Sequence, residues 1–193
     1  MKARKGTSLN LYRLSTIIAC LILIGSAITS IVNYQKKKKP ILLYAFFSTF
    51  IASCFYIYFV FRNTVPIRVR YLDWILTTPL LLQELSILMN LENVGAITSV
   101  IILNMLVFVF GFLGEIGVTS RGLGCILGFI PLLLFFAILL FFGDYSFYLP
   151  LFFVVWSMYG ITYLIRSNTI RNISYNILDV VSKGVFTLAL VYL

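Results

Sequence analysis

The sequence predicts an all-α protein, a bundle of seven transmembrane helices, from two observations. Hydrophobic residues make up 61% of the 193 residues and charged residues only 11%, with a mean hydropathy of +1.04. Soluble proteins average about 25% charged residues. In addition, seven apolar runs of about 20 residues follow one another, each long enough to cross roughly 30 Å of hydrocarbon. Residues 1–193 are therefore expected to form a single membrane domain, because the short connections leave no room for a soluble one.

The predicted helices are separated by short polar clusters. The first follows a basic start, MKARKGTSLNLYRL, and is long for the apolar part of a secretory signal, so we interpret it as a span. The second follows the stretch QKKKKP, the third contains three charged side chains, the sixth is rich in aromatic residues, and the seventh has a lysine at its midpoint. In chain order, the predicted ranges are Leu14–Val32, Ile41–Phe61, Val69–Met89, Gly95–Ile116, Leu123–Phe142, Phe147–Ile165 and Ile173–Leu193.

Composition argues against several classes of function. The chain has no histidine and only three scattered cysteines, so we expect neither a metal site, nor a histidine-dependent hydrolase, nor any other enzyme. A net charge of +9 could suggest nucleic acid, but the sequence lacks the soluble basic face that such binding needs. The expected partner is the lipid bilayer. Its anionic headgroups could attract Lys36–Lys39, although these lysines can also be a solvated loop that only fixes topology.

The basic residues also predict an orientation. Of the 15 lysines and arginines, four are Lys36–Lys39, one is Lys183, and the other ten fall on the amino-terminal side of the predicted helices. The positive-inside rule alone would place that side in the cytoplasm.

A polar stripe runs along the third predicted helix. At 100° per residue, Arg70, Asp73, Thr77 and Glu84 fall within a sector of about 60°, and Pro79 points the other way. Ionisable groups are costly at membrane depth, so each of them requires a partner or a function.

Lys183 is the most informative residue of the last predicted helix. It lies about 15 Å from either end of that helix, beyond the reach of a snorkelling side chain. Asp179, one turn earlier on the same face, is an available partner. One interpretation is a buried ion pair that only holds helices together. The other is a desolvated lysine that acts as a nucleophilic amine and forms a Schiff base with an aldehyde.

Aromatic residues indicate where a ligand of Lys183 could lie. The stretch WSMYGITYL places Trp156, Tyr159 and Tyr163 on neighbouring turns of the sixth predicted helix, and Trp74 stands beside Asp73 in the third. Both tryptophans of the chain are in the middle of predicted spans, whereas tryptophan usually concentrates at membrane interfaces. Two such rings could sandwich a flat, conjugated ligand.

Three motifs, RYLDWILTTPLLL, WSMYG and LDVVSKGVF, together resemble the microbial (type I) rhodopsins, with matching order and spacing over the third to seventh helices. The resemblance implies all-trans retinal bound to Lys183 as a protonated Schiff base, with Asp73 and Asp179 as its counter-ions. It also implies that Tyr56 and Tyr159 donate hydrogen bonds to Asp179. The remaining side chains implied to surround retinal are Trp74, Trp156, Tyr163, Gly111 and Leu81, the last of which is typical of green absorption.

Asp73, Thr77 and Glu84 match the Asp-Thr-Glu pattern of outward proton pumps of the proteorhodopsin type. The resemblance implies that Asp73 accepts the Schiff-base proton, that Thr77 hydrogen-bonds to it, and that Arg70 keeps it ionised in the dark and gates the exit. Glu84, about 16 Å further along the helix and surrounded by leucines, is expected to stay protonated and to act as proton donor. The resemblance also implies a hydrogen bond between Thr78 and Asn104.

The chain departs from the family pattern in four places. Only fourteen residues separate Tyr56 from Arg70, so the connection between the second and third helices is short, as in compact viral rhodopsins. The segment before the last helix has Arg166 and Arg171 in place of the carboxylate pair that releases protons in archaeal pumps. Gly160 stands where many relatives have proline, and the chain has no histidine to pair with Asp73.

These features favour a light-driven outward proton pump, with a light-gated cation channel of the viral rhodopsin type as the alternative. In the channel, a water path would be lined by polar residues of the first, second and last helices, among them Ser15, Ser48 and Asn176. A photosensor and a seven-helix protein that binds nothing are further alternatives. The family orientation puts the amino terminus outside, against the charge rule. The resemblance also implies a trimer or pentamer in a plasma or host cell membrane that transports protons or small cations.

Overall fold

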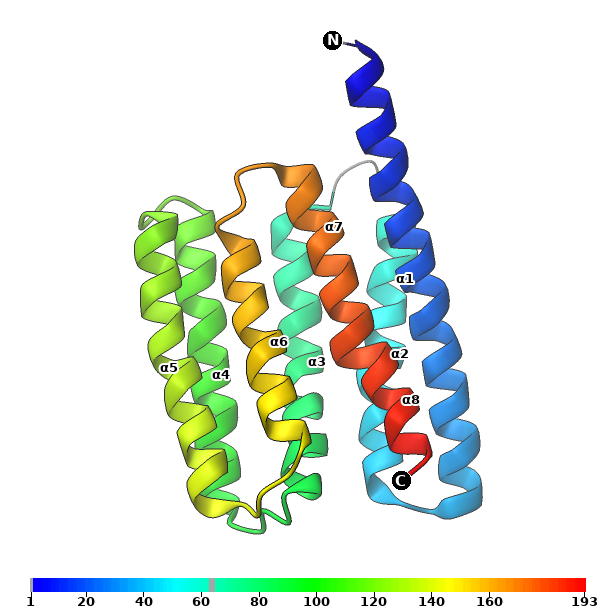
Figure 1. Cartoon of the computed structure of the whole chain (residues 1–193), viewed down its shortest axis with the longest axis vertical. Helices are drawn as coiled ribbons and strands as arrows, with labels where there is room; N and C mark the ends of the chain where they lie inside the picture. The colour runs from blue at the N-terminus through cyan, green and yellow to red at the C-terminus, as the bar shows by residue number, and fades with distance from the viewer. Residues whose placement is uncertain (1, 63–64) are drawn as a thin grey trace.

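The computed structural model describes residues 2–62 and 65–193, with side chains from Asn10 onward. The helices lie side by side in one bundle (Figure 1), and the described residues contain no strand. Their bounds are α1 Lys2–Lys37, α2 Pro40–Val60, α3 Ile67–Leu88, α4 Val94–Glu115, α5 Arg121–Phe142, α6 Tyr148–Tyr163, α7 Asn168–Asp179, η1 Val180–Val185 and α8 Phe186–Val191. Because α7, η1 and α8 form one rod, the bundle has seven helices, as predicted.

Several helices begin or end at residues other than the predicted ones. Capping hydrogen bonds explain two of these differences. The side chain of Asn93 accepts from the backbone N–H of Ala96, and that of Ser120 from Leu123, so α4 and α5 begin one and two residues before the apolar runs do. The first helix extends from Lys2 to Lys37, well beyond its apolar run, because its flanking residues are also compatible with a helix. The predicted seventh helix is one rod interrupted by a wider π-helical turn, Val180–Val185, which contains Lys183.

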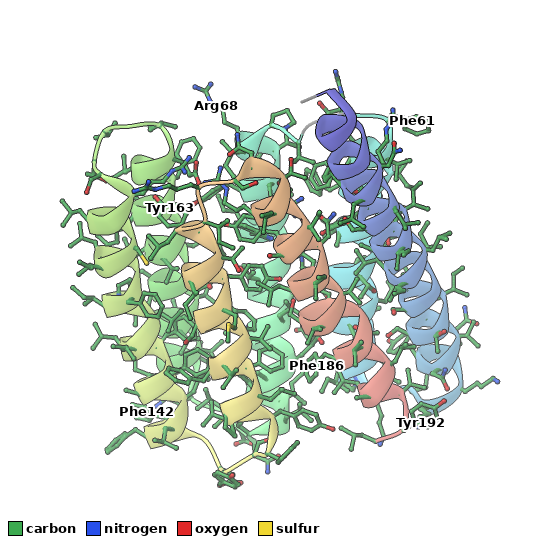
Figure 2. All side chains as sticks on the ribbon, turned by 45° about the horizontal axis from the view of Figure 1, so that its top comes forward. Phe61, Arg68, Phe142, Tyr163, Phe186 and Tyr192 are labelled. Carbon is green, nitrogen blue, oxygen red and sulfur yellow. The ribbon has the colours of Figure 1, made fainter. Side chains whose placement is uncertain are left out.

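Five helices are long and apolar enough to cross a membrane by length and composition. The two others are α3, which carries the charged stripe, and α6, an apolar helix of 16 residues. Large apolar side chains such as Leu21, Phe141 and Ile126 are exposed on the outside of the bundle, where Figure 2 shows side chains pointing away from the helices. A bundle with an apolar exterior and charged residues in its interior has the polarity that a lipid environment requires.

The two ends of the bundle have different connections. We call one end the N-terminal side; it holds the amino terminus and the α2–α3, α4–α5 and α6–α7 connections (Figure 1). We call the other end the lysine-loop side, after Lys36–Lys39 between α1 and α2; it also holds the α3–α4 and α5–α6 connections. On the lysine-loop side, Asn90 donates a hydrogen bond to Asp144 over 3.0 Å and so joins two of these connections.

Candidate functional site

The polar stripe of α3 faces the interior of the bundle. The side chains of Arg70, Asp73, Thr77 and Glu84 are all 0% exposed. The helical spacing that predicts a common face therefore also predicts their burial.

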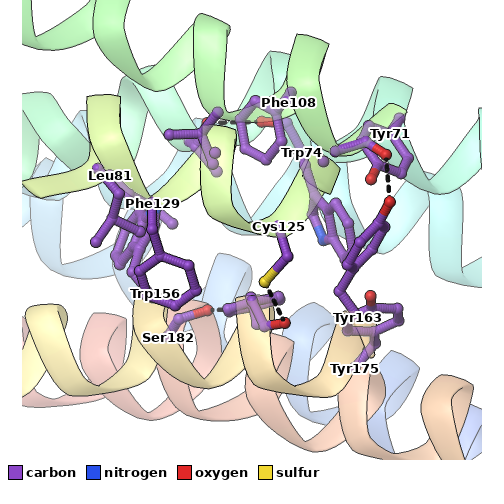
Figure 3. Close-up of a pocket in the computed structure, with 18 of the residues that line it drawn as sticks. Tyr71, Trp74, Leu81, Phe108, Cys125, Phe129, Trp156, Tyr163, Tyr175 and Ser182 are labelled. Carbon is purple, nitrogen blue, oxygen red and sulfur yellow. Dashed lines mark hydrogen bonds between the residues drawn. The ribbon is translucent and has the colours of Figure 1, made fainter. Parts of the chain in front are cut away.

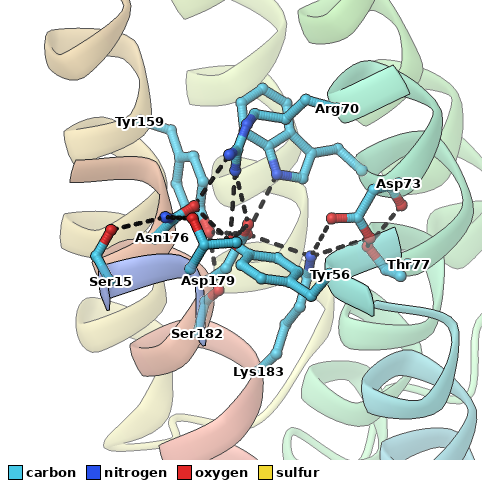
Figure 4. A network of polar contacts seen from close by, with 12 residues as sticks. Ser15, Tyr56, Arg70, Asp73, Thr77, Tyr159, Asn176, Asp179, Ser182 and Lys183 are labelled. Atoms are coloured by element: carbon cyan, nitrogen blue, oxygen red, sulfur yellow. Dashed lines mark hydrogen bonds and ion pairs between the residues drawn. The ribbon is translucent and has the colours of Figure 1, made fainter. Parts of the chain in front are cut away.

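Lys183 lies between two carboxylates from different helices (Figure 4). Its Nζ is 3.3 Å from Oδ2 of Asp73 on α3 and 3.2 Å from Oδ1 of Asp179 on α7. The lysine itself is only 1% exposed, so its amine depends on these two acids for neutralisation. The predicted partner Asp179 is thus in place, and the fold adds Asp73 from 110 positions earlier in the chain.

Asp179 accepts hydrogen bonds from side chains of three other helices. The phenols of Tyr56 and Tyr159 donate to it over 2.7 and 2.6 Å. The indole Nε1 of Trp74 donates over 3.2 Å, and Nη1 of Arg70 lies 3.4 Å away. A carboxylate with this many donors is well stabilised as an anion without water.

Arg70 makes direct contacts with residues of the last helix. Its guanidinium contacts Asp179 and donates from Nη2 to Oδ1 of Asn176 over 3.0 Å. That Arg70 keeps Asp73 ionised stays a prediction. Among the hydrogen bonds and ion pairs of the described residues, none joins Arg70 to Asp73. The physical reason is that Asp73 is turned toward Lys183, whereas Asp179 projects from α7 toward the guanidinium (Figure 4).

Asn176 is a site residue that the sequence indicates only as part of a possible channel. Its amide oxygen accepts from Arg70 and from Tyr56, and its Nδ2 donates to the hydroxyls of Ser15 and Thr16 on α1, each over 3.0 Å. Asn176 thereby links Arg70 to α1. Its position three residues before Asp179, on the same side of the last helix, is the signal that could have identified it.

Thr77 makes only a weak contact with the predicted acceptor. Its hydroxyl donates to the backbone carbonyl of Asp73 over 2.8 Å, while the carboxylate oxygen Oδ1 is 3.5 Å away. The hydroxyl is therefore satisfied mainly within its own helix.

Glu84 occupies an apolar region on the lysine-loop side. Ser48 on α2 donates to its Oε1 over 3.0 Å, and its Oε2 has no hydrogen-bond partner among the described residues. The neighbouring Leu81, Leu82 and Leu85 belong to the largest apolar cluster of the bundle. With no cation paired to it in the described part of the chain, burial favours the neutral acid.

An apolar cavity extends from Lys183 between α3, α4, α5 and α6 (Figure 3). It encloses about 740 Å³ of atom-free space, its open mouth included. The predicted residues that line it are Lys183, Trp74, Leu81, Gly111, Trp156, Tyr159 and Tyr163. Tyr56, which was also predicted, is not among the lining residues, because its phenol is directed to Asp179.

The cavity has further walls that the motifs do not single out. They include Tyr71, Phe108, Phe129 and Tyr175, which come from four different helices. Gly111 is needed here because a Cβ would lie 2.7 Å from the phenol oxygen of Tyr71, so the glycine makes room for a wall residue. At the cavity wall, Nδ2 of Asn104 donates to Oγ1 of Thr78 over 2.7 Å and ties α4 to α3, in the pairing that the resemblance implies.

The chemistry of this cavity fits an apolar aldehyde. Its walls are aromatic and aliphatic side chains, and one amine, that of Lys183, lies at its polar end between two acids. Ligand sites usually combine such an apolar slot with a few polar groups that fix orientation.

The sequence profile of the bacteriorhodopsin-like protein family matches residues 7–193. Among solved structures, the viral rhodopsin OLPVRII superimposes with a TM-score of 0.85 at 23% identity, over 94% of this chain and 96% of that one. The blue light-absorbing proteorhodopsin from Med12 gives 0.82 at 24% identity, over 94% of each chain. The proton pumping rhodopsin AR2 from the marine alga Acetabularia acetabulum gives 0.82 at 21% identity, over 94% and 93%. No curated protein sequence gives a significant match.

Proposed function

The chain belongs to the bacteriorhodopsin-like family of seven-helix membrane proteins, and on this premise we propose that it is a light-driven outward proton pump. The observation that carries the proposal is the arrangement along α3. Asp73 contacts the amine of Lys183, and Glu84 stands isolated eleven residues further on, about 16 Å toward the other side of the bundle. An acceptor and a donor on opposite sides of one amine are the parts that directional proton transfer needs.

Members of the family bind retinal, and the cavity supports all-trans retinal as the cofactor of this chain. Lys183 would attach it, and Trp74, Trp156 and Leu81 would hold its flat polyene. When bound as a protonated Schiff base, retinal supplies light absorption and a light-driven change in the direction and acidity of one N–H group.

Asp73 is better suited than Asp179 to accept a proton. Asp179 is surrounded by donors from Tyr56, Tyr159, Trp74 and Arg70, all of which favour its anionic form. Among the described residues, the carboxylate of Asp73 has only Lys183 as an ion-pair partner and the distant hydroxyl of Thr77 as a further donor. When the amine gives up its charge, Asp73 loses its main stabilising partner and takes the proton, while Asp179 remains an anion.

Glu84 would replace the proton from the lysine-loop side. Its surroundings favour the neutral acid, and Ser48 fixes the orientation of its carboxyl group. On the N-terminal side, Arg70 places a positive charge across the route, which opposes the return of a proton from that side.

Outward transport requires that the N-terminal side face the exterior. The basic residues near that side oppose this orientation, but Arg70 is buried in the site and the charge rule sets a bias with exceptions. The same site in the inverted orientation would move protons inward.

Voltage-clamped photocurrents from cells that express the pigment test the proposal, with an epitope tag at the amino terminus to report its side. We expect an outward current that keeps its sign at all voltages up to the limit of the pump. A current that reverses at the equilibrium potential of an ion would instead establish the channel. The hydroxyl and amide groups of Ser15, Thr16 and Asn176, in contact between α1 and α7, support this second candidate.

A further inference from the structure

The part of the cavity that lies away from Lys183 carries hydrogen-bonding side chains that the proposed proton route does not use. Lys183 belongs to the last helix, whereas Gly111 is on α4 and Gly124 is on α5, which lie on the other side of α6 (Figure 1). All three residues line the cavity, so it extends from the last helix to the α4–α5 pair. We call the part beside Gly111 and Gly124 the far end.

Two phenols meet at Gly111. Oη of Tyr163 on α6 donates to the backbone carbonyl of Gly111 over 3.0 Å, and a Cβ at Gly124 would lie 3.2 Å from the same oxygen. A Cβ at Gly111 would lie 2.7 Å from Oη of Tyr71 on α3. Both hydroxyls therefore lie next to Gly111, and Figure 3 shows the two tyrosines at the same end of the cavity.

The hydroxyl of Tyr71 differs from its polar neighbours at the far end in its hydrogen bonding. Tyr163 is paired as described, and Sγ of Cys125 lies 3.6 Å from the backbone carbonyl of Gly160. Among the hydrogen bonds of the described residues, none involves Oη of Tyr71, although this residue is only 6% exposed. The same holds for the hydroxyl of Tyr175, which lines the cavity from the last helix. A buried hydroxyl costs free energy unless it finds a partner.

We propose that the cavity is built for a retinal that carries a hydroxyl group on its ring, with the far end as the subsite for that hydroxyl; this inference rests on retinal as the cofactor of the proposed pump. Condensation of the aldehyde with the amine of Lys183 releases water and directs the ring toward the far end. Tyr71 donates a hydrogen bond to the ring hydroxyl. The ring hydroxyl in turn donates to Oη of Tyr163, whose own proton is given to Gly111.

The same geometry disfavours an unsubstituted ring. Such a ring covers Oη of Tyr71 with carbon and offers it no acceptor, so the cost of burying that hydroxyl is not recovered. A site that is built to hydrogen-bond a hydroxyl group discriminates against the analogue that lacks it, because the polar groups of the site are then left unpaired. The preference between the two aldehydes therefore depends on the phenols of the far end.

The test offers limiting apoprotein an equimolar mixture of all-trans retinal and all-trans 3-hydroxyretinal, whose hydroxyl is at the tip of the ring. Borohydride reduction fixes the adducts, and mass spectrometry compares their amounts on the peptide that contains Lys183. In the wild type we expect about tenfold more of the hydroxylated adduct, the effect of one satisfied buried hydrogen bond. Equal amounts of the two adducts, or an excess of the plain retinal adduct, would overturn the proposal.

Tyr71→Phe removes the proposed donor, and the ratio of the two adducts should fall to about one. The ratio does not depend on the yield of folded protein, so a poorly folding variant still reports it. If Tyr71→Phe forms no adduct, Tyr163→Phe removes the proposed acceptor and should also lower the ratio. Tyr145→Phe, the same change at an exposed position, is the control and should keep the wild-type ratio. A wild-type ratio in the cavity variants would refute the subsite.

Failure of the proposed function has a different signature. Pigment that forms with either aldehyde but gives no pump current would contradict the pump, while the adduct ratio would still decide the role of the far end. Wild-type protein that forms no adduct with either aldehyde would contradict both the cofactor and the subsite.

Discussion

The two halves of the bundle interior, on either side of Lys183, are built from different chemistry. On the N-terminal side, the carboxylate of Asp179 accepts hydrogen bonds from Tyr56, Tyr159 and Trp74. It also forms an ion pair with Arg70. On the lysine-loop side, Glu84 has one hydrogen bond among the described residues, from Ser48, and its helix neighbours Leu81, Leu82 and Leu85 belong to the largest apolar cluster. The first half is a polar network. The second half is an apolar cluster around one acid, and we call this cluster the apolar seal.

This difference determines which half can stabilise a buried carboxylate anion. A buried carboxylate with several donors can remain an anion, whereas one in an apolar environment is stable only as the neutral acid. In the proposed pump, a proton would therefore move toward the N-terminal side by exchange among existing polar groups. A proton from the other side would first be stored on Glu84 and would then be replaced across the apolar seal.

The largest expected effect comes from removing the residue that joins the two halves. Lys183→Ala should abolish pigment formation, because no other amine reaches the cavity among its lining residues. Visible absorption after addition of all-trans retinal measures this, with mass spectrometry of the reduced wild type to locate the adduct. Lys36→Ala, on the exposed loop, is the control and should form pigment normally. A coloured Lys183→Ala variant, or an adduct elsewhere in the wild type, would contradict the site.

The next effect should be confined to the lysine-loop half. Glu84→Gln keeps the shape and the hydrogen bond from Ser48 but removes the proton that this half stores. We expect recovery of the dark state to slow by about 100-fold and to depend strongly on external pH, because protons must then cross the apolar seal directly. Flash photolysis at several pH values measures this. A photocycle identical to that of the wild type would show that Glu84 is not the donor.

The smallest expected effect tests whether the number of hydrogen bonds to Glu84 and to Asp179 matters. Ser48→Ala removes the one donor to Glu84 found in the described part of the chain, at a cost of about 1 kcal/mol or roughly fivefold in recovery rate. Tyr56→Phe removes one of several donors to Asp179, so its effect on recovery should be smaller. The comparison is made on the same flash-photolysis traces. A larger effect from Tyr56→Phe would mean that the polar half, and not the apolar half, limits recovery.

Several features follow from the sequence because they depend only on local spacing. The apolar runs and the motifs predict the seven-helix fold and the family, and both predictions are confirmed. The helical period places Arg70, Asp73, Thr77 and Glu84 on one face, and that face is buried. The roles assigned to these residues, the bound retinal and the oligomeric state stay predictions.

Other features depend on which helices meet, and spacing along one helix carries no information about them. The ion pair between Arg70 on α3 and Asp179 on α7 is one of them. The contacts of Asn176 with α1, and of Glu115 with α5 and α7, likewise join residues that the motifs do not relate.

The sequence by itself determined that this protein is a membrane bundle with one buried lysine and a polar stripe, because hydropathy and helical period act within single segments. Only the tertiary structure decided which acid faces which cation. A buried charge is stabilised by whichever opposite charge or donor the packing brings within about 4 Å, and packing is a property of the whole bundle.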